Sequence, residues 1–544
     1  MKQILSNAKV YVEKGHYAQA VLVEDGCIAK VGTDEEVLKA AADCKNIIDC
    51  GGRTLIPGLN DTHLHFMQAG EVMNQAQIDG VSSIGEMIEI CKEFAKTHPD
   101  QVKQGLHAIG WNQDLFTDGD RLPDRHDLDQ ISTEFPIVLE RVCGHIVSTN
   151  TKLIEILGID GDSPQYPDGE FLIGDDGYPN GIFTANACNI AKNVVPDFTM
   201  EERREILLDT MRDAVAHGLT SVQSNDVGTT FMDGPAAFAM FHDVYDKGEA
   251  LLRYRHQVCF NDFEAFEKYL TEGEFAKGNY GEDSWLTLGP LKLFKDGSLG
   301  ARTALMKNGY VPDRENHGLE WIKKDEMEKY CQLAKKYNLQ VVTHVIGDAA
   351  VESTMDCYEN AFVDGENKLR HALVHCQITD EALLDRIAEK GILVFAQPIF
   401  LDYDMHIVEE LCGKELASTS YAFGSLQKKG AHVSYGTDCP VEYYNPFENI
   451  YMAVTRKDRA GNPAEGFNPK ECVDVETAVD AYTIESAYAE FMEDRKGRIK
   501  EGYYADMVLL DRDIFTVDPM EIKEILPIMT MVGGKIVYQR EANR

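Results

Sequence analysis

Short apolar segments alternate with amphipathic helical segments through the middle of this chain. Helical periodicity is typical of residues 324–337 and 380–390, and each of these segments lies between two short apolar runs. Parallel strands need such alternation, because the crossover between them takes a dozen residues or more and is usually a helix. Eight segments are predicted to be strands: 55–61, 219–222, 251–255, 291–294, 340–344, 372–375, 392–395 and 433–436. Eight strand-helix units predict an α/β fold, the (β/α)₈ TIM barrel.

The first connection of this barrel is abnormally long. About 150 residues separate the first predicted strand from the second, far more than one strand-helix unit needs. That stretch has strand and turn signals of its own, for example at 136–140 and 175–181. We therefore predict a subdomain inserted after strand 1, at about residues 70–200, which could cover the mouth of the barrel.

Both ends of the chain are rich in β-forming residues. The pair Asp25-Gly26 marks a tight turn between two β-rich runs near the N-terminus, and Gly533-Gly534 does the same near the C-terminus. One small domain that uses both ends is the simplest arrangement. We predict a composite β-sandwich at 1–56 and 495–544, with the barrel at 57–494 between its two halves.

Composition and charge exclude several classes of protein. The 544 residues include 53 basic and 91 acidic side chains, for a net charge of −38. Such a surface repels phosphate, which argues against a nucleic-acid partner; a cationic substrate fits it, but a solvated acidic surface is the simpler explanation. No run of about 18 apolar residues and no signal-peptide core occur, so we expect a cytoplasmic protein without a membrane partner. The 13 cysteines are scattered without a Cys-x-x-Cys motif, which argues against disulfides or a cysteine zinc site.

The first predicted strand leads into two histidines one residue apart. His63 and His65 close the run Pro57-Gly58-Leu59-Asn60-Asp61-Thr62-His63-Leu64-His65. In a strand, residues two apart share a face, so both imidazoles could hold one metal ion. With 16 histidines in the chain, chance alone gives roughly half of one such pair, so the spacing by itself decides nothing.

Further potential ligands stand near the ends of later predicted strands. His344 and His375 end two of them, Asp438 follows another, and Lys292 lies inside the fourth. The intervals are 31 residues from His344 to His375 and 63 from His375 to Asp438, about one and two strand-helix units. Taken singly, each residue has a structural explanation, such as helix capping for Asp438. Together they stand in barrel order, and a lysine in a buried strand is costly unless it is paired or modified.

The combined motifs resemble those of the amidohydrolase superfamily. The resemblance is to its YtcJ-like branch, amidohydrolase family 3, which includes proteins similar to N-substituted formamide deformylase. Five stretches carry it across nearly the whole chain: 57–65, 292–304, 343–349, 436–438 and 502–508. Gly110-Trp111-Asn112 and Gly144-His145 match the inserted region of the branch.

The resemblance implies a metal-dependent hydrolase of carbon–nitrogen bonds other than peptide bonds. By position, His63, His65 and Asp438 would bind one metal, His344 and His375 would bind a second, and carboxylated Lys292 would bridge them. The implied cofactor is a pair of divalent cations, expected to be Zn²⁺. A metal-bound hydroxide would attack an amide-type carbonyl, with Asp438 as general base and then general acid.

Four residues are predicted to contact a small-molecule, amide-type substrate. These are Trp111, His145, Arg302 and Gln397. Trp111 fits the core of the insert equally well, and Arg302 could instead pair with an acid such as Asp296. A homodimer is left open.

Two regions depart from the pattern of the branch. The strand-6 motif usually has charged residues between its histidines, where this chain has Ala372 and Val374. A glutamate often found in the insert is replaced by Ala185. These departures affect the expected substrate specificity more than the expected metal binding.

Other functions are also compatible with parts of this pattern. A mononuclear deaminase would usually have a glutamate three residues after His344, where this chain has Gly347, and it would give Lys292 no role. Ester or lactone hydrolysis would use the same site. A non-catalytic regulatory protein on an amidohydrolase fold is a third alternative, and the complete ligand set argues against it.

Overall fold

The computed structural model describes residues 2–228, 234–260, 262–278, 280–281 and 284–541. They fall into two compact units, which are described separately. The larger unit is Met1–Phe66 with Leu207–Arg544, and the smaller unit is Met67–Ile206. None of the helices in these described ranges is long and apolar enough to cross a membrane.

Eight parallel strands form the centre of the larger unit. In spatial order they are β8 (Leu59–Leu64), β14 (Leu219–Val227), β15 (Arg253–Val258), β16 (Leu286–Phe294), β17 (Val341–Val345), β18 (Ala372–His375), β19 (Leu393–Ala396) and β20 (Val433–Tyr435). The ends of β20 and β8 meet, since Asp438 N donates to His63 O at 2.8 Å and His65 N to Cys439 O at 2.7 Å. The predicted (β/α)₈ barrel is therefore confirmed.

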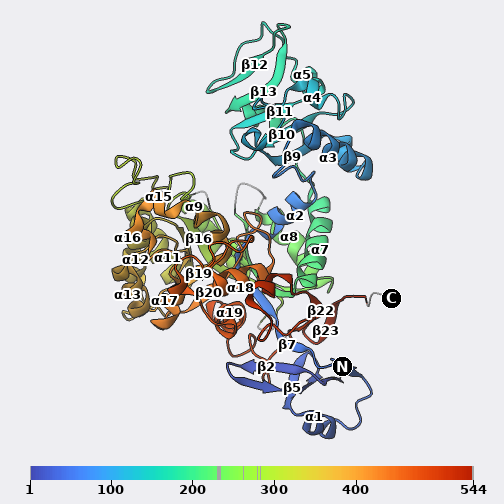
Figure 1. Ribbon diagram of the computed structural model, residues 1–544, viewed down its shortest axis with the longest axis vertical. Coiled ribbons are helices and arrows are strands. Elements are labelled where there is room, and N and C mark those ends of the chain that lie inside the picture. The colour runs from blue at the N-terminus through green and yellow to red at the C-terminus, as the bar shows by residue number, and fades with distance from the viewer. Residues whose placement is uncertain (1, 229–233, 261, 279, 282–283, 542–544) are drawn as a thin grey trace. The chain divides into compact units, whose positions relative to one another are not determined.

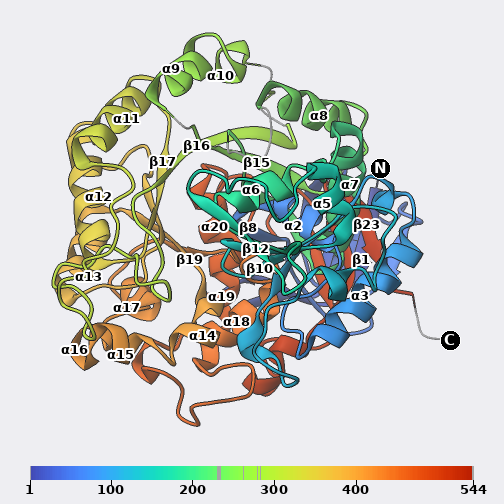
Figure 2. The same cartoon turned by 90° about the horizontal axis from the view of Figure 1, so that it is seen from above.

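Amphipathic helices cover the outside of these strands (Figure 2). They include α8 (Gly234–Asp246), α9 (Phe263–Thr271), α11 (Lys324–Lys336), α12 (Asp348–Ala361), α13 (Glu381–Lys390) and α17 (Phe423–Lys428). In α11 the buried residues Met327, Tyr330, Cys331 and Ala334 repeat at helical spacing. Helix α13 begins where Asp380 caps the Leu383 N–H and ends at left-handed Gly391, as its sequence signals predict. Three further helices follow β20: α18 (Pro446–Thr455), α19 (Val475–Tyr482) and α20 (Ile484–Ala489).

Strands from both termini share a sheet in the larger unit. The six-stranded sheet has the order β23 (Lys535–Gln539), β22 (Pro527–Val532), β21 (Met507–Leu510), β7 (Thr54–Pro57), β2 (Lys9–Glu13) and β3 (His16–Ala18). Val508 of β21 pairs antiparallel with Ile56 of β7, and Figure 1 shows the blue and red ends of the chain meeting there. A four-stranded sheet adds β5 (Cys27–Gly32), β4 (Ala20–Glu24), β1 (Lys2–Ser6) and β6 (Ile47–Asp49). Leu5, Val10 and Met507 lie in one buried core, so the two ends of the chain fold together.

The smaller unit has its own mixed sheet and core. Its strand order is β12 (Gly169–Ile173), β13 (Pro179–Ala185), β11 (Ile146–Thr149), β10 (Ile137–Arg141) and β9 (Leu106–Trp111). Its helices include α3 (Ile84–Thr97), α5 (Thr151–Leu157) and α6 (Ala187–Lys192). The insert predicted at about 70–200 and this unit differ by a few residues at each end. The predicted boundary at 56/57 falls inside β7, and the predicted domain boundaries stay predictions.

Candidate metal centre

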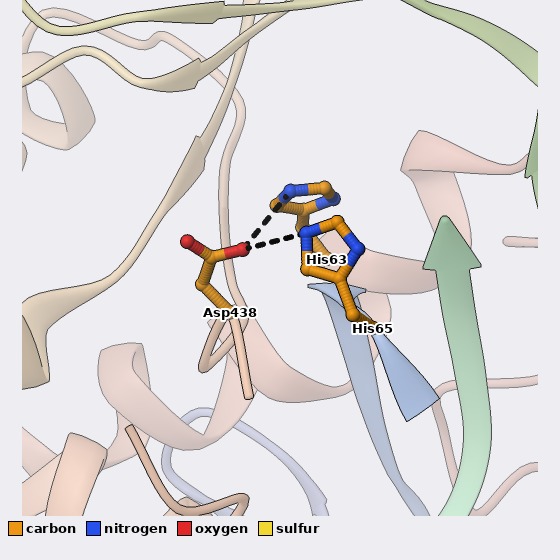
Figure 3. A group of neighbouring side chains, drawn as sticks. All are labelled: His63, His65 and Asp438. Atoms are coloured by element: carbon orange, nitrogen blue, oxygen red, sulfur yellow. Dashed lines mark ion pairs between the residues drawn. The ribbon is translucent and has the colours of Figure 1, made fainter. Parts of the chain in front are cut away.

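Three potential ligands meet where β8 and β20 end. His63 lies in β8, His65 follows its last residue, and Asp438 follows β20. Asp438 Oδ1 is 3.2 Å from His63 Nε2 and 3.5 Å from His65 Nε2. Figure 3 shows both imidazoles and the carboxylate turned toward one another. One ligand atom from each of the three lies within 4.8 Å of the others, close enough to bind one cation.

Two glutamine side chains fix the ring protons of His63 and His375. Gln257 Nε2 donates to a backbone carbonyl at 2.8 Å and Gln397 Nε2 to another at 3.0 Å, which sets the direction of both amides. Their Oε1 atoms must then accept, so His63 Nδ1 donates to Gln257 and His375 Nδ1 to Gln397, each at 2.7 Å. Both histidines therefore keep an unprotonated Nε2, which is the form that ligates metal.

Backbone carbonyls fix the other two rings. His65 Nδ1 donates to Asn225 O at 2.8 Å, so Nε2 is the nitrogen that faces Asp438. Although desolvation opposes it, the hydrogen bond to Asp438 and the charge of that carboxylate raise the pKa of His65 above its usual value. His344 has the opposite arrangement, because its Nε2 donates to Gly297 O at 3.0 Å and leaves Nδ1 unprotonated. In their neutral forms the four histidines thus offer one lone pair each, three through Nε2 and one through Nδ1.

Burial keeps the imidazoles of His63, His344 and His375 neutral. Desolvation, with the charge of Lys292 as the next cause, lowers the pKa of His63 to about 4 and that of His344 to about 3. Burial also lowers the pKa of His375 well below its usual value. No proton has to be removed from these rings at neutral pH before a cation can bind.

His344 and His375 lie beside the first group. The His375 ring is centred 5.8 Å from that of His63 and 4.5 Å from that of His344. His375 and Asp438 have φ angles of +73° and +59°, a backbone region that side chains other than glycine rarely adopt. Such strain is typical of functional sites, where the surrounding structure holds a side chain in place.

Lys292 is fully buried in β16. Within the described residues its Nζ has no hydrogen-bond partner, and it lies 4.0 Å from the centre of the Phe294 ring. Burial lowers the pKa of Lys292 to about 8. At neutral pH a larger fraction of Lys292 is therefore in the uncharged amine form than in an exposed lysine, and the uncharged amine is the form that can be modified.

This donor set fits a bound cation. His63 Nε2, Asp438 Oδ1 and Lys292 Nζ are buried without a hydrogen-bond partner among the described residues. Because His63 keeps its proton on Nδ1, the electron pair of its Nε2 faces Asp438 Oδ1 across 3.2 Å, and His65 Nε2 lies 3.5 Å from the same oxygen. A divalent cation would satisfy these electron pairs, and imidazole and carboxylate are the ligands that zinc takes in catalytic sites.

The residues predicted to contact substrate lie in different settings. Gln397 is 2% exposed and accepts a hydrogen bond from His375, so it orients a candidate ligand. Trp111 lies in the core of the smaller unit, where its Nε1 donates to Leu139 O, which makes it a core residue. His145 is exposed in the smaller unit and Arg302 is exposed in the larger. Asp296 accepts three backbone N–H groups within the larger unit, so it is not the partner that the sequence suggested for Arg302.

Two further buried residues at the candidate centre did not stand out in the sequence motifs. One is Gln257, and the other is Asp61, which accepts from the backbone N–H of His63 and from the hydroxyl of Thr437 at 2.7 Å. Burial raises the pKa of Asp61 to about 7. In the sequence, both are polar residues near the end of a barrel strand. Asp61 stands two residues before the candidate ligand His63, and Gln257 stands two residues after the predicted strand 251–255.

The departures at strand 6 have a packing explanation. Ala372 and Val374 lie in a buried apolar cluster with Val342 and Phe395, so no charged partner is needed there. Ala185 is exposed in the smaller unit, with a φ angle of +50°.

Comparisons with known proteins show the family of this chain. The model of the amidohydrolase family matches residues 46–538. The putative amidohydrolase YtcJ of Bacillus subtilis is 30% identical, over 99% of this chain and 100% of its own length. N-substituted formamide deformylase of Arthrobacter pascens is 25% identical, over 99% and 98% of the two chains. The crystal structure of an uncharacterized metal-dependent hydrolase from Pyrococcus furiosus superposes with a TM-score of 0.77 at 26% identity, covering 95% of this chain and all of that one.

With a family match across most of its length, an eight-stranded barrel and a cluster of two histidines and an aspartate that could hold a metal ion, this chain belongs to the amidohydrolase family, enzymes with a metal-dependent hydrolase fold that act on carbon–nitrogen bonds other than peptide bonds.

Proposed function

We propose that the protein is a binuclear metal hydrolase of small, non-peptide amides. His63, His65 and Asp438 would hold one divalent cation, His344 and His375 a second, and carboxylated Lys292 would bridge the two. The observation that supports this most directly is the convergence of His63 Nε2, His65 Nε2 and Asp438 Oδ1, with His63 Nε2 and Asp438 Oδ1 buried and without a hydrogen-bond partner among the described residues. We expect zinc, since imidazole and carboxylate ligands suit it.

Asp438 would move the proton. The bound cations would supply Lewis acidity, which acidifies water and polarises a carbonyl. A carboxylate oxygen of Asp438 would accept the proton of the attacking water and deliver it to the nitrogen of the leaving amine. The hydrogen bond from Asp438 N to His63 O, 2.8 Å long, holds this residue at the rim of the barrel where both transfers would occur.

Lys292 would become a ligand by reaction with carbon dioxide. Its neutral amine would form a carbon–nitrogen bond to CO₂ and lose one proton, which yields an anionic carbamate. The reaction needs the uncharged amine, which the lowered pKa of about 8 favours. It also replaces an unpartnered buried amine by an oxygen anion that two cations can share.

An N-formyl or other N-acyl amine is the proposed substrate class. The formamide deformylase of Arthrobacter pascens, similar over nearly the whole chain, motivates it. A deaminase-like site is less compatible with the packing. A side chain at Gly347, where the deaminase pattern has a glutamate, would place its Cβ 2.1 Å from Leu305 O. Hydrolysis of esters or lactones would need the same groups and is tested with the same substrate panel.

Metal analysis and one substitution test the proposal. Protein purified with zinc and bicarbonate should contain two metal ions per chain, and a panel of N-formyl and N-acyl amines should include a substrate. Asp438→Asn should retain metal and lower kcat by about 10²- to 10⁴-fold, the usual effect of a general acid–base group. A near-normal rate would contradict the role of Asp438. One metal ion would favour a deaminase-like site, and none would favour a non-catalytic protein.

A further inference from the structure

An aromatic side chain beside the metal centre has no role in holding metal. Trp321 lies in the loop between β16 and α11, and its side chain is 58% exposed. Its ring is parallel to that of His344, with an interplanar angle of 2° and centres 6.4 Å apart. The Phe294 ring, at the end of β16, is centred 6.0 Å from Trp321 and 5.8 Å from His344. The indole of Trp321 is thus open to solvent, with its centre 6.4 Å from that of the candidate ligand His344.

Hydrogen bonds to the buried Lys295 fix the position of Trp321. Lys295 is fully buried, and its ammonium donates to Glu320 Oε1 at 2.8 Å and to Ile322 O at 3.0 Å. These are the two residues that flank Trp321 in the chain. The backbone N–H of Trp321 also donates to Lys295 O at 2.9 Å. Two hydrogen bonds to the backbone and one to the Glu320 side chain therefore hold the segment 320–322, so the exposed indole is presented on a rigid support.

A second aromatic ring accompanies the neighbouring histidine. Phe400 follows β19 and stacks on His375, with centres 5.7 Å apart and an interplanar angle of 16°. Each histidine of the proposed second metal thus has an aromatic ring packed along it, Trp321 on His344 and Phe400 on His375. Rings that pack on both histidines would form an apolar boundary beside any carbonyl held there.

From this arrangement we infer that Trp321 is a specificity-determining residue which stacks on a planar aromatic substituent of the substrate. The inference rests on the proposed function, because it assumes that an amide is held beside His344 and His375. Covering the exposed indole surface with a second ring lowers the free energy of the complex. An aromatic pair is stabilised by more than the buried area alone provides. A saturated substituent of equal size would be stabilised only by the burial of apolar surface. Trp321 should therefore discriminate aryl from cyclohexyl substrates.

The test uses matched pairs of substrates with metal-loaded protein. Formanilide and N-cyclohexylformamide place the ring on the amine side, and benzamide and cyclohexanecarboxamide place it on the acyl side. In Trp321→Ala the aryl-to-cyclohexyl ratio of kcat/KM should fall by about 2- to 12-fold for the pair whose ring meets the indole, mainly through KM. Trp321→Phe should restore part of the ratio. Trp285→Ala is the matched control, since this indole precedes the first residue of β16, Leu286, and packs on Arg253.

Binding provides a readout that does not depend on turnover. Dissociation constants of benzamide and cyclohexanecarboxamide, measured by calorimetry on wild-type and Trp321→Ala protein, should differ in the same sense as the kinetic ratio. If amides are hydrolysed and the ratio is unchanged in Trp321→Ala for both pairs, the inference is overturned and the proposed function stands. If no amide is hydrolysed but Trp321→Ala selectively weakens benzamide binding, the proposed function fails and the aromatic subsite stands.

Discussion

His256 should make the larger unit lose stability in mild acid. This histidine lies in β15, is fully buried, and has no hydrogen bond to either ring nitrogen within the described residues. The rings of Phe241 and Tyr254 are centred 4.6 and 5.0 Å from it. Desolvation lowers the pKa of His256 to about 3; the charge of His242 adds to this effect and that of Glu274 opposes it.

The sign follows from proton linkage. An unfolded chain binds a proton at His256 with a pKa near 6.5, whereas the folded chain resists it down to about 3. The neutral ring therefore contributes its full stability above pH 6.5, and this contribution is lost as the pH falls toward 3. At pH 5 the loss of unfolding free energy from this one group is about 2 kcal/mol. The reason is that pH 5 lies about 1.5 units below the unfolded pKa, and each unit corresponds to 1.36 kcal/mol.

The measurement compares wild-type protein with His256→Leu, which cannot titrate. Guanidinium unfolding of the larger unit, followed by fluorescence, would be measured at pH 7.5 and pH 5.0. Whatever the packing cost of leucine, the difference in unfolding free energy between the two proteins should shift by about 2 kcal/mol in favour of the variant at pH 5.0. Acid effects at the metal centre occur in both proteins and cancel. His16→Leu, at an exposed position, should show no such shift. An identical difference at both pH values would show that His256 binds a proton equally well in the folded and unfolded chains.

Two further predictions concern the metal centre and the closure of the barrel. Gln257→Leu removes the acceptor that fixes the Nδ1 proton of His63, so zinc affinity, measured by competition with a chromophoric chelator, should fall about 10- to 100-fold; unchanged affinity would contradict the assigned tautomer. Gly436→Ala would place a Cβ 2.7 Å from His63 N and 2.8 Å from Asp61 Oδ1, so chemical denaturation should show a loss of about 1–3 kcal/mol. Gly85→Ala, in a helix with the nearest atom 3.9 Å away, is its control, and equal stabilities of the two variants would argue against tight closure.

Much of the fold follows from local patterns. Each barrel strand is an apolar run, and each covering helix repeats its buried residues at helical spacing, as in α11. Because all barrel strands run parallel, their carboxyl ends must meet at one rim. This geometric rule is why spacing along the chain predicted that His63, His344, His375 and Asp438 would gather. Their individual roles as ligands stay predictions.

Short-range periodicity and parallel strand direction are enough to predict which segments form the barrel strands and which ligand-type residues reach the rim. Which polar atoms meet depends on how the whole chain folds. Gln257 and His63 are 194 residues apart, yet their hydrogen bond fixes the tautomer of a candidate ligand. Gln397, predicted to contact substrate, is held by His375 instead, and Trp321 acquires its place only because Lys295 and His344 come together across neighbouring strands. The reason is that hydrogen bonds and ring contacts depend on distances of a few ångströms between distant segments, and these are set when the barrel closes and its register is fixed.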